Sequence, residues 1–200
     1  MNKIFLPLSE DCYSTTYCIT NNLRSDSFPL DWVYASPVRA FNCLKNEFKD
    51  LYKADDLDVA GMNPRVKTIE SKYCLFNKNY CLLMPHFIVD FDQDIINMQS
   101  KMQHRANKLI NYFKSNIPLE IVYKPLSSIN KRNTFFKRCY SESQKQEFGL
   151  HNMNIVFPEI KDYLINVYNY NPNDISLHII TRGSANFKKI GRINRGNLYE

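Results

Sequence analysis

The sequence predicts an α/β fold: a layered, mostly parallel sheet with helices on both faces and an inserted β-hairpin. Two observations carry this prediction. Short apolar runs typical of buried strands alternate along the chain with segments whose apolar residues recur at helical spacing. In addition, two apolar runs flank Asn77-Lys78-Asn79, a sequence that favours a tight turn between antiparallel strands.

The N-terminal part of the chain is expected to form one strand and two helices. Lys3 to Leu8 is a short apolar run typical of a buried strand. A helix is predicted from about Cys12 to Leu23, with Ser9 or Asp11 as its N-cap. A second helix is predicted from Val38 to Tyr52, where apolar residues recur at three- and four-residue steps.

The rest of the chain continues this alternation. Residues 53 to 64 are polar and are expected to be irregular, and the hairpin is predicted to pair Val66 to Tyr73 with Tyr80 to Val89. The later elements are expected to be a helix from Ile95 to Phe113, a strand from Leu119 to Tyr123, a helix from Phe157 to Tyr168 and a strand from Ile175 to Thr181.

Length and composition suit one intracellular domain. A chain of 200 residues can bury a core without cross-links, and we predict a single α/β domain over 1–185 and a basic tail over 186–200. No secretory signal or membrane-spanning apolar run is visible, so we expect a cytoplasmic protein, in the host cytoplasm if its source is viral. The six cysteines contain no Cys-x-x-Cys pair and are expected to be thiols.

The distribution of charge and the spacing of possible metal ligands indicate which classes of partner to expect. Basic residues outnumber acidic ones in 130–145, which contains Arg132, and in 182–200, which begins with Arg182. These clusters suggest an anionic ligand, although a solvated surface is the commoner meaning of such runs. Cys and His spacing does not fit a metal site, no cofactor motif is present, and no nucleic-acid motif is found. We therefore expect no metal, cofactor, nucleic acid or membrane partner.

Several polar residues follow predicted strands. In α/β sheets, functional residues gather beyond the carboxyl ends of the strands. Cys12, the basic cluster after Tyr123 and Arg182 all fall just beyond strand ends. The sequence therefore predicts that they contribute to one site.

Four short motifs occur in a linked order near the N-terminus. They are Leu8-Ser9-Glu10-Asp11-Cys12, Asn22-Leu23-Arg24, Ser27-Phe28-Pro29-Leu30-Asp31-Trp32 and Asn46-Glu47-Phe48-Lys49-Asp50-Leu51. This order resembles the bacterial and viral family of papain-like cysteine peptidases, which carries Leu-Gly-x-x-Cys, Gly-Leu-Arg, Ser-x-Pro-Phe-Asp-Trp and Asn-Asp-Phe-x-Asp-Phe. A histidine element near His86, a basic helix around Arg105 and the strand Leu119 to Tyr123 also fit, so the resemblance covers roughly two thirds of the chain.

The chain departs from the family pattern at several positions. Ser9 replaces the family's glycine, and Leu30 replaces its phenylalanine. The family's compact His-Asp-Phe becomes His86 followed by Phe87-Ile88-Val89-Asp90-Phe91. Either His86 is the family's histidine with residues inserted behind it, or Val89 stands in its place and Cys12 lacks a base; we favour His86 because geometry defines such pairs. The papain name implies a barrel-like half, whereas the residue pattern favours a layered sheet.

The resemblance implies that Cys12 is a nucleophile and His86 its base. A helix start after a strand suits a reactive cysteine, because backbone N–H dipoles stabilise a thiolate, while Glu10 and Asp11 oppose that charge. The structural alternatives are that Cys12 is a small buried apolar residue and that His86 is a core histidine whose ring is hydrogen-bonded.

Asp31 is the best candidate to orient the imidazole, ahead of Asp90 and Asp92. Asp31 can instead cap a turn, with Trp32 as a buried anchor. Trp32 is also a candidate binding residue.

Two functions therefore remain. The first is thiol-dependent hydrolysis or acyl transfer by Cys12, with peptide substrates implied only by the family resemblance. The second is a non-catalytic module whose basic loops, through Arg132 and Arg182, hold a phosphate or sugar-phosphate partner.

Overall fold

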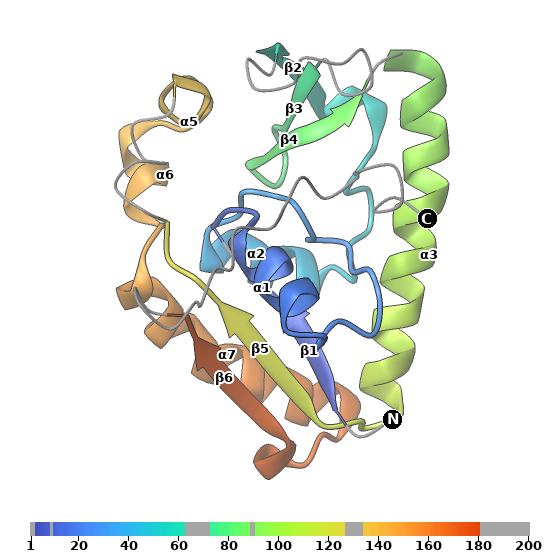
Figure 1. Cartoon of the computed structure of the whole chain (residues 1–200), viewed down its shortest axis with the longest axis vertical. Helices are drawn as coiled ribbons and strands as arrows, with labels where there is room; N and C mark the ends of the chain where they lie inside the picture. Colours follow the sequence, from blue (N-terminus) through green and yellow to red (C-terminus); the bar gives the residue numbers. More distant parts are fainter. Residues whose placement is uncertain (1–2, 9, 63–72, 89–90, 127–133, 181–200) are drawn as a thin grey trace.

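Two three-stranded β-sheets and one shared hydrophobic core organise the chain (Figure 1). The computed structural model describes residues 3–8, 10–62, 73–88, 91–126 and 134–180. Core side chains come from both sheets and from the helices around them, for example Ile121 from the first sheet, Leu75 from the second and Leu109 from the longest helix. The predicted tail, 186–200, lies outside the described residues.

Sheet A consists of three parallel strands in the order β1 (Ile4–Pro7), β5 (Leu119–Tyr123) and β6 (Ile175–Ile179). The central strand β5 is almost wholly buried, as expected when both faces of a parallel sheet are covered. Because all three strands run in one direction, their carboxyl ends meet at one edge of the sheet. The three strands were predicted close to these positions.

Sheet B consists of β2 (Leu57–Met62), β3 (Tyr73–Asn77) and β4 (Leu82–Ile88), all antiparallel. The hairpin turn after β3 is stabilised by the buried Asn77, whose Oδ1 accepts from the Tyr80 N–H at 2.7 Å. The turn around Asn77 was predicted. The expectation that residues 53 to 64 are irregular is wrong, since β2 lies there, and most of the predicted strand Val66 to Tyr73 lies outside the described residues.

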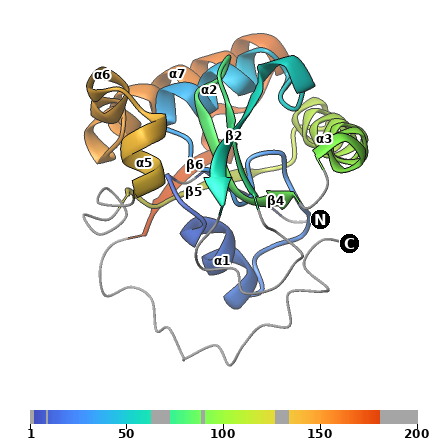
Figure 2. The same cartoon turned by 90° about the horizontal axis from the view of Figure 1, so that it is seen from above.

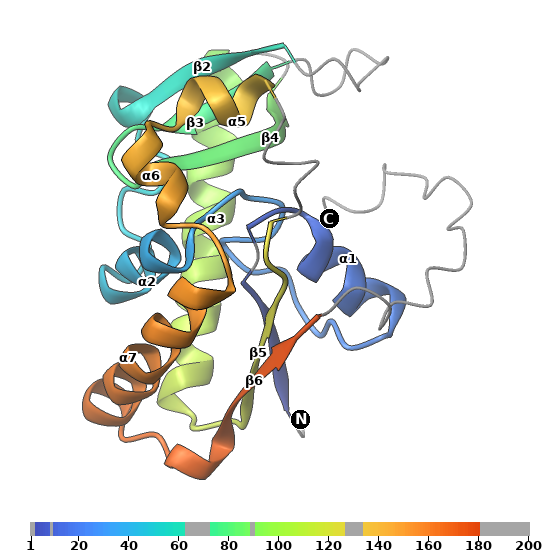
Figure 3. The same ribbon diagram turned by 90° about the vertical axis from the view of Figure 1, so that its left-hand side faces the viewer.

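Helices cover both faces of sheet A (Figure 3). Helix α1 (Tyr13–Thr20) lies on one face, and α7 (Leu150–Tyr168) with α2 (Pro37–Lys45) lies on the other. The long helix α3 (Phe91–Lys114) runs alongside both sheets (Figure 1). None of the helices in the described part of the chain is long and apolar enough to cross a membrane.

Two short helices beside sheet B were not predicted. They are α5 (Thr134–Cys139) and α6 (Glu142–Gln146), and α5 lies next to β2 (Figure 2). Two 3-10 turns, Ala54–Asp56 and Pro172–Asp174, precede β2 and β6. The α/β class is thus confirmed, with the antiparallel strands forming a sheet of their own beside the parallel one.

Candidate functional site

The carboxyl edge of sheet A gathers residues that follow β1 and β5. Glu10, Asp11 and Cys12 come after β1, and Lys124 follows β5 directly. Glu10 and Asp11 are 0% and 1% exposed, which is unusual for carboxylates and requires charged or hydrogen-bonding partners.

Glu10 finds its partners on segments more than a hundred residues away. One carboxylate oxygen accepts from the Tyr123 hydroxyl at 2.5 Å and from the Gly149 N–H. The other accepts from the Leu126 N–H at 2.6 Å. Burial and the charge of Glu10 raise the pKa of Tyr123 far above its usual value, so this phenol remains a donor. Glu10 therefore joins the loop after β1 to the end of β5 and the start of α7.

Asp11 and Lys124 form a second pair at the same edge. The Asp11 carboxylate accepts from the Tyr13 N–H at 2.9 Å in the first turn of α1. Lys124 Nζ lies 3.8 Å from Asp11 Oδ2 and 3.8 Å from the centre of the Tyr13 ring. Sequence analysis missed Lys124, although its position immediately after a predicted strand was a signal for it.

Cys12 occupies the N-cap position of α1 and is half-buried. It packs against a set of apolar residues here called the sheet B cluster: Tyr34, Ala60, Cys74, Cys81, Leu83, Leu126, Phe136, Tyr140 and Phe148. Cys139 is the other half-buried cysteine, while the remaining four are buried.

Burial makes most of the other thiols harder to ionise. It raises the pKa of Cys18 to about 12 and that of Cys74 to about 11. It also raises the pKa of Cys43 and of Cys139. Because the thiolate is the nucleophilic form of cysteine, these four residues are poor nucleophiles near neutral pH.

Asp31 is fully buried and holds together two of the motifs seen in the sequence. Its Oδ2 accepts from Arg24 Nη2 at 2.6 Å and from the Phe28 N–H at 3.0 Å. Its Oδ1 is buried without a hydrogen-bond partner among the described residues. Asp31 thus caps a backbone N–H of its turn, which was one of its two expected roles; its orienting role stays a prediction.

Trp32 has a left-handed backbone conformation, with φ of 65°. Its side chain is half-buried rather than a fully buried anchor. Left-handed backbone costs a residue with a bulky side chain roughly 1–2 kcal/mol and is concentrated at functional sites. The predicted motif is therefore a strained segment held in place by the buried Asp31.

The strand that carries His86 lies beside this segment. The Tyr34 N–H donates to the Leu83 carbonyl at 2.8 Å, and the Leu83 N–H returns a bond to the Tyr34 carbonyl at 3.2 Å. The Tyr140 hydroxyl joins the same bridge by donating to the Tyr34 carbonyl at 3.0 Å. His86 belongs to β4, three residues beyond Leu83, but its side chain lies outside the described part of the structure. The contact between Cys12 and His86 remains a prediction.

Arg132 and Arg182 lie outside the described residues, as do Val89 and Asp90. Within the described ranges, no group of three or more His, Cys, Asp or Glu side chains could hold a metal ion.

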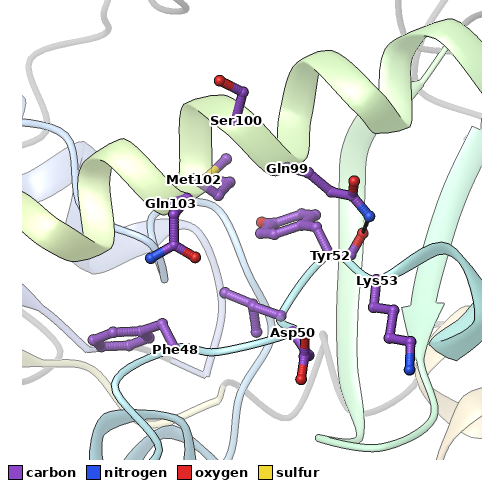
Figure 4. Close-up of a pocket in the computed structure, with 9 residues that line it drawn as sticks. Phe48, Asp50, Tyr52, Lys53, Gln99, Ser100, Met102 and Gln103 are labelled. Carbon is purple, nitrogen blue, oxygen red and sulfur yellow. Dashed lines mark hydrogen bonds between the residues drawn. The ribbon is translucent and has the colours of Figure 1, made fainter.

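A separate pocket of about 340 Å³ lies between α3 and the segment that follows α2 (Figure 4). The Tyr52 carbonyl at its wall accepts from Gln99 Nε2 at 2.7 Å. Its lining contains none of the site residues predicted from the sequence: Phe48, Asp50, Leu51, Tyr52, Lys53, Gln99, Ser100, Met102 and Gln103. The candidate site is therefore the edge around Cys12.

Comparisons of the chain with protein-family models, with curated proteins and with solved structures find no match.

Proposed function

We propose that the chain is a thiol-dependent hydrolase or acyl transferase of the papain-like cysteine peptidase type, with Cys12 as nucleophile and His86 as base. One observation carries the proposal: three separated segments converge. Cys12 packs against the sheet B cluster, and that cluster contains both Tyr34 and Leu83. Tyr34 follows the Asp31-Trp32 motif, while Leu83 lies on the strand of His86.

In the proposed reaction, His86 takes the thiol proton of Cys12, and the sulfur attacks the acyl carbon of the substrate. The new S–C bond replaces the C–N or C–O bond to the leaving group, which receives the proton from His86. Water, or another hydroxyl or amine, then attacks the thioester and restores the thiol. Hydrolysis and acyl transfer differ only in this acceptor, and peptides remain the expected substrates by resemblance.

The carboxylates beside Cys12 do not stand against this proposal. Glu10 accepts three hydrogen bonds, and Asp11 is paired with a backbone N–H and faces Lys124. Hydrogen bonds and a nearby cation offset much of the repulsion that a carboxylate exerts on a thiolate. The N-cap position adds the favourable dipole of α1.

A reducing compartment suits this chemistry. All six cysteines lie within the described residues, and each is present as a thiol. Reactive thiols persist where glutathione and thioredoxin keep them reduced. We therefore propose the cytoplasm as the site of action.

If the proposal is correct, iodoacetamide at about pH 6.5 should label Cys12 at least about tenfold faster than any other cysteine. The reason is that burial disfavours ionisation of Cys18, Cys43, Cys74 and Cys139. The fifth, Cys81, is buried, which keeps the reagent from its thiol. A mass-mapped time course on the full chain measures the rate at each site.

Two variants complete this test. Cys12→Ser should remove the fast site, whereas Cys139→Ser, which changes the other half-buried cysteine, should leave the Cys12 rate unchanged. With p-nitrophenyl acetate as the acyl donor, intact-mass analysis should find one acetyl group on Cys12 and none on the Cys12→Ser variant. Labelling of Cys12 at the same rate as the other cysteines would rule out an activated thiol.

A second candidate function is a non-catalytic site for an anionic ligand. Lys124 favours it, because this cation stands at the carboxyl edge of sheet A next to the start of α1. Charge-assisted hydrogen bonds from lysine and arginine are the usual means of holding phosphate. Arg132 and Arg182 would complete such a site from the loops after β5 and β6.

Replacing Arg132 and Arg182 together with alanine separates the two candidates. A phosphate-binding module should bind inorganic phosphate more weakly and with less salt dependence, by about tenfold in affinity, with little change in thermal stability. Isothermal titration of the full chain measures the affinity. A hydrolase acting on neutral acyl donors should keep its acetylation rate in this variant and lose it in Cys12→Ser.

A further inference from the structure

The outer strands of the two sheets differ in how they are protected against pairing with another chain. Sheet A ends in β1 and β6, and sheet B ends in β2 and β4. An unprotected outer strand presents a row of backbone N–H and C=O groups to which a further strand can bind. Proteins protect such edges with proline, with bulges, with charged side chains or with a covering segment.

The outer edge of β1 is protected by proline. The N–H groups of Ile4 and Leu8 point towards β5 and donate to carbonyls there at 2.7 and 2.9 Å. Because the bonds to one neighbour alternate along a strand, Phe5 and Pro7 direct their backbone groups outward. Pro7 has no N–H, so this edge lacks one of the donors that a further strand would need.

Both outer strands of sheet B are also protected. β2 contains a bulge between Val59 and Gly61, and it lies against α5. β4 pairs with β3 on one side, and on its other side Leu83 bridges to Tyr34. A further strand would have to displace these contacts before it could add to sheet B.

β6 has none of these protections. Its five residues, Ile-Ser-Leu-His-Ile, include no proline, glycine, lysine, arginine or acidic residue, and its register with β5 runs from Ile175 to Ile179 without a bulge. It is the outermost strand of sheet A, and no strand in the described part of the chain pairs with its outer side (Figure 3). Residues 176–179 are only half-buried, so this edge is partly open to solvent.

Every second residue of β6 directs its backbone groups outward. The Ile180 N–H, directly after the strand, donates to the Tyr123 carbonyl of β5 at 2.8 Å. Since such bonds alternate along a strand, the even-numbered residues of β6 bond to β5. The odd-numbered residues, with Leu177 at their centre, therefore present their N–H and C=O groups to the outside.

The sequence of β6 is complementary to itself about Leu177. Read in either direction, it has apolar residues at the first, third and fifth positions and polar residues between them. If two copies run antiparallel about a two-fold axis, Leu177 meets Leu177 in a hydrogen-bonded pair, and Ile175 meets Ile179. Ser176 then faces His178 in a non-hydrogen-bonded pair, where side chains approach most closely.

We propose that β6 is a dimerisation edge, at which a second copy of the chain extends sheet A by antiparallel β6–β6 pairing. The partner is a second copy rather than an unrelated peptide, because the strand's own sequence supplies the match of apolar with apolar and polar with polar positions. This pairing does not depend on the activity of Cys12. The interface is small, so we expect a reversible dimer with a dissociation constant on the order of 1 to 100 µM.

Sedimentation velocity on the full chain over about 1 to 300 µM should show a shift from monomer to dimer. The double variant Ser176→Lys, His178→Lys places like charges opposite each other across the axis and should weaken dimerisation at least about tenfold. Its matched control, Ser176→Lys, His178→Glu, changes the same half-buried positions but places opposite charges there. This control should dimerise at least as tightly as the unmodified chain.

Hydrogen exchange at single amides locates the interface. Exchange of the Leu177 amide should slow as the protein concentration rises, whereas exchange of the Phe5 amide, which faces outward from the opposite edge of sheet A, should not change. A chain that stays monomeric over the whole concentration range overturns the inference. So does a dimer that both double variants form equally, or one that leaves exchange at Leu177 unchanged. If the variant with two lysines does not fold, the concentration series and the exchange at Leu177 in the unmodified chain decide the question.

Discussion

Replacing Glu10 with alanine is expected to cost about 4 kcal/mol or more in the free energy of unfolding. The carboxylate is 0% exposed and accepts from the Tyr123 hydroxyl and from the N–H groups of Leu126 and Gly149. Its loss leaves three donors without an acceptor, each costing about 1–3 kcal/mol when buried. For a chain of this size the melting temperature should fall by about 8 to 16 °C, which calorimetry can measure.

A matched variant and a double-mutant cycle show whether the hydrogen bonds of Glu10 account for the loss of stability. Glu120→Ala removes a half-buried carboxylate of β5 that pairs with the exposed Lys3, and should cost about 1 kcal/mol or less. Tyr123→Phe removes one donor to Glu10 and should cost less in the Glu10→Ala background than alone. Equal losses from Glu10→Ala and Glu120→Ala would contradict the anchoring role.

Replacing Arg24 with methionine is expected to destabilise the protein by about 3–5 kcal/mol at neutral pH. Arg24 is the direct partner of Asp31, and the two side chains are 12% and 0% exposed. Removing one member of a buried ion pair leaves a charge that water cannot reach. Urea denaturation at about pH 7.5 measures the loss.

The loss should shrink as the pH falls. Burial raises the pKa of Asp31, and losing Arg24 should raise it further. A buried acid with a raised pKa binds a proton more tightly in the folded state than in the unfolded state. Proton binding therefore stabilises the fold at low pH, and this stabilisation is lost as the pH rises through the folded pKa. The same titration at about pH 5 should therefore give a smaller difference between Arg24→Met and the unmodified chain.

The Arg39–Glu147 ion pair provides the control for this pH dependence. It has comparable bond lengths near 2.7 Å, but both side chains are about a quarter exposed. Arg39→Met should cost less, and its loss should change little over the same pH range. A loss in Arg24→Met that is equal at both pH values would show that Asp31 does not titrate in this window.

Local patterns predicted the parallel sheet and its helices because each element carries its own period. The apolar run Leu119–Tyr123 and the helical spacing of α3 can be recognised without knowing which other elements pack against them. The residue at which α2 ends could not be predicted from the local pattern. The helical pattern continues to Tyr52, yet the helix ends at Lys45, and Glu47, Phe48 and Asp50 adopt left-handed backbone.

Sheet B provides the reason for this early end. Asn77 Nδ2 donates to the Leu51 carbonyl at 2.8 Å, and the Tyr80 hydroxyl donates to the Lys49 carbonyl at 2.7 Å. These bonds hold the segment after α2 in a turn, and together with burial of Phe48 and Leu51 they override local helix propensity. The short helices α5 and α6 were missed because five or six residues are too few for a periodic signal.

By itself, the sequence determined the α/β class, the strands of sheet A and the position of Cys12 between a strand and a helix. These features depend on residues that are close together in the sequence. Only the tertiary structure decided that Glu10 is a buried anchor, that Arg24 pairs with Asp31, and that the Asp31 segment lies beside the strand of His86. Such contacts join residues of unrelated local pattern, because burial and charge compensation act through space and leave no period in the chain.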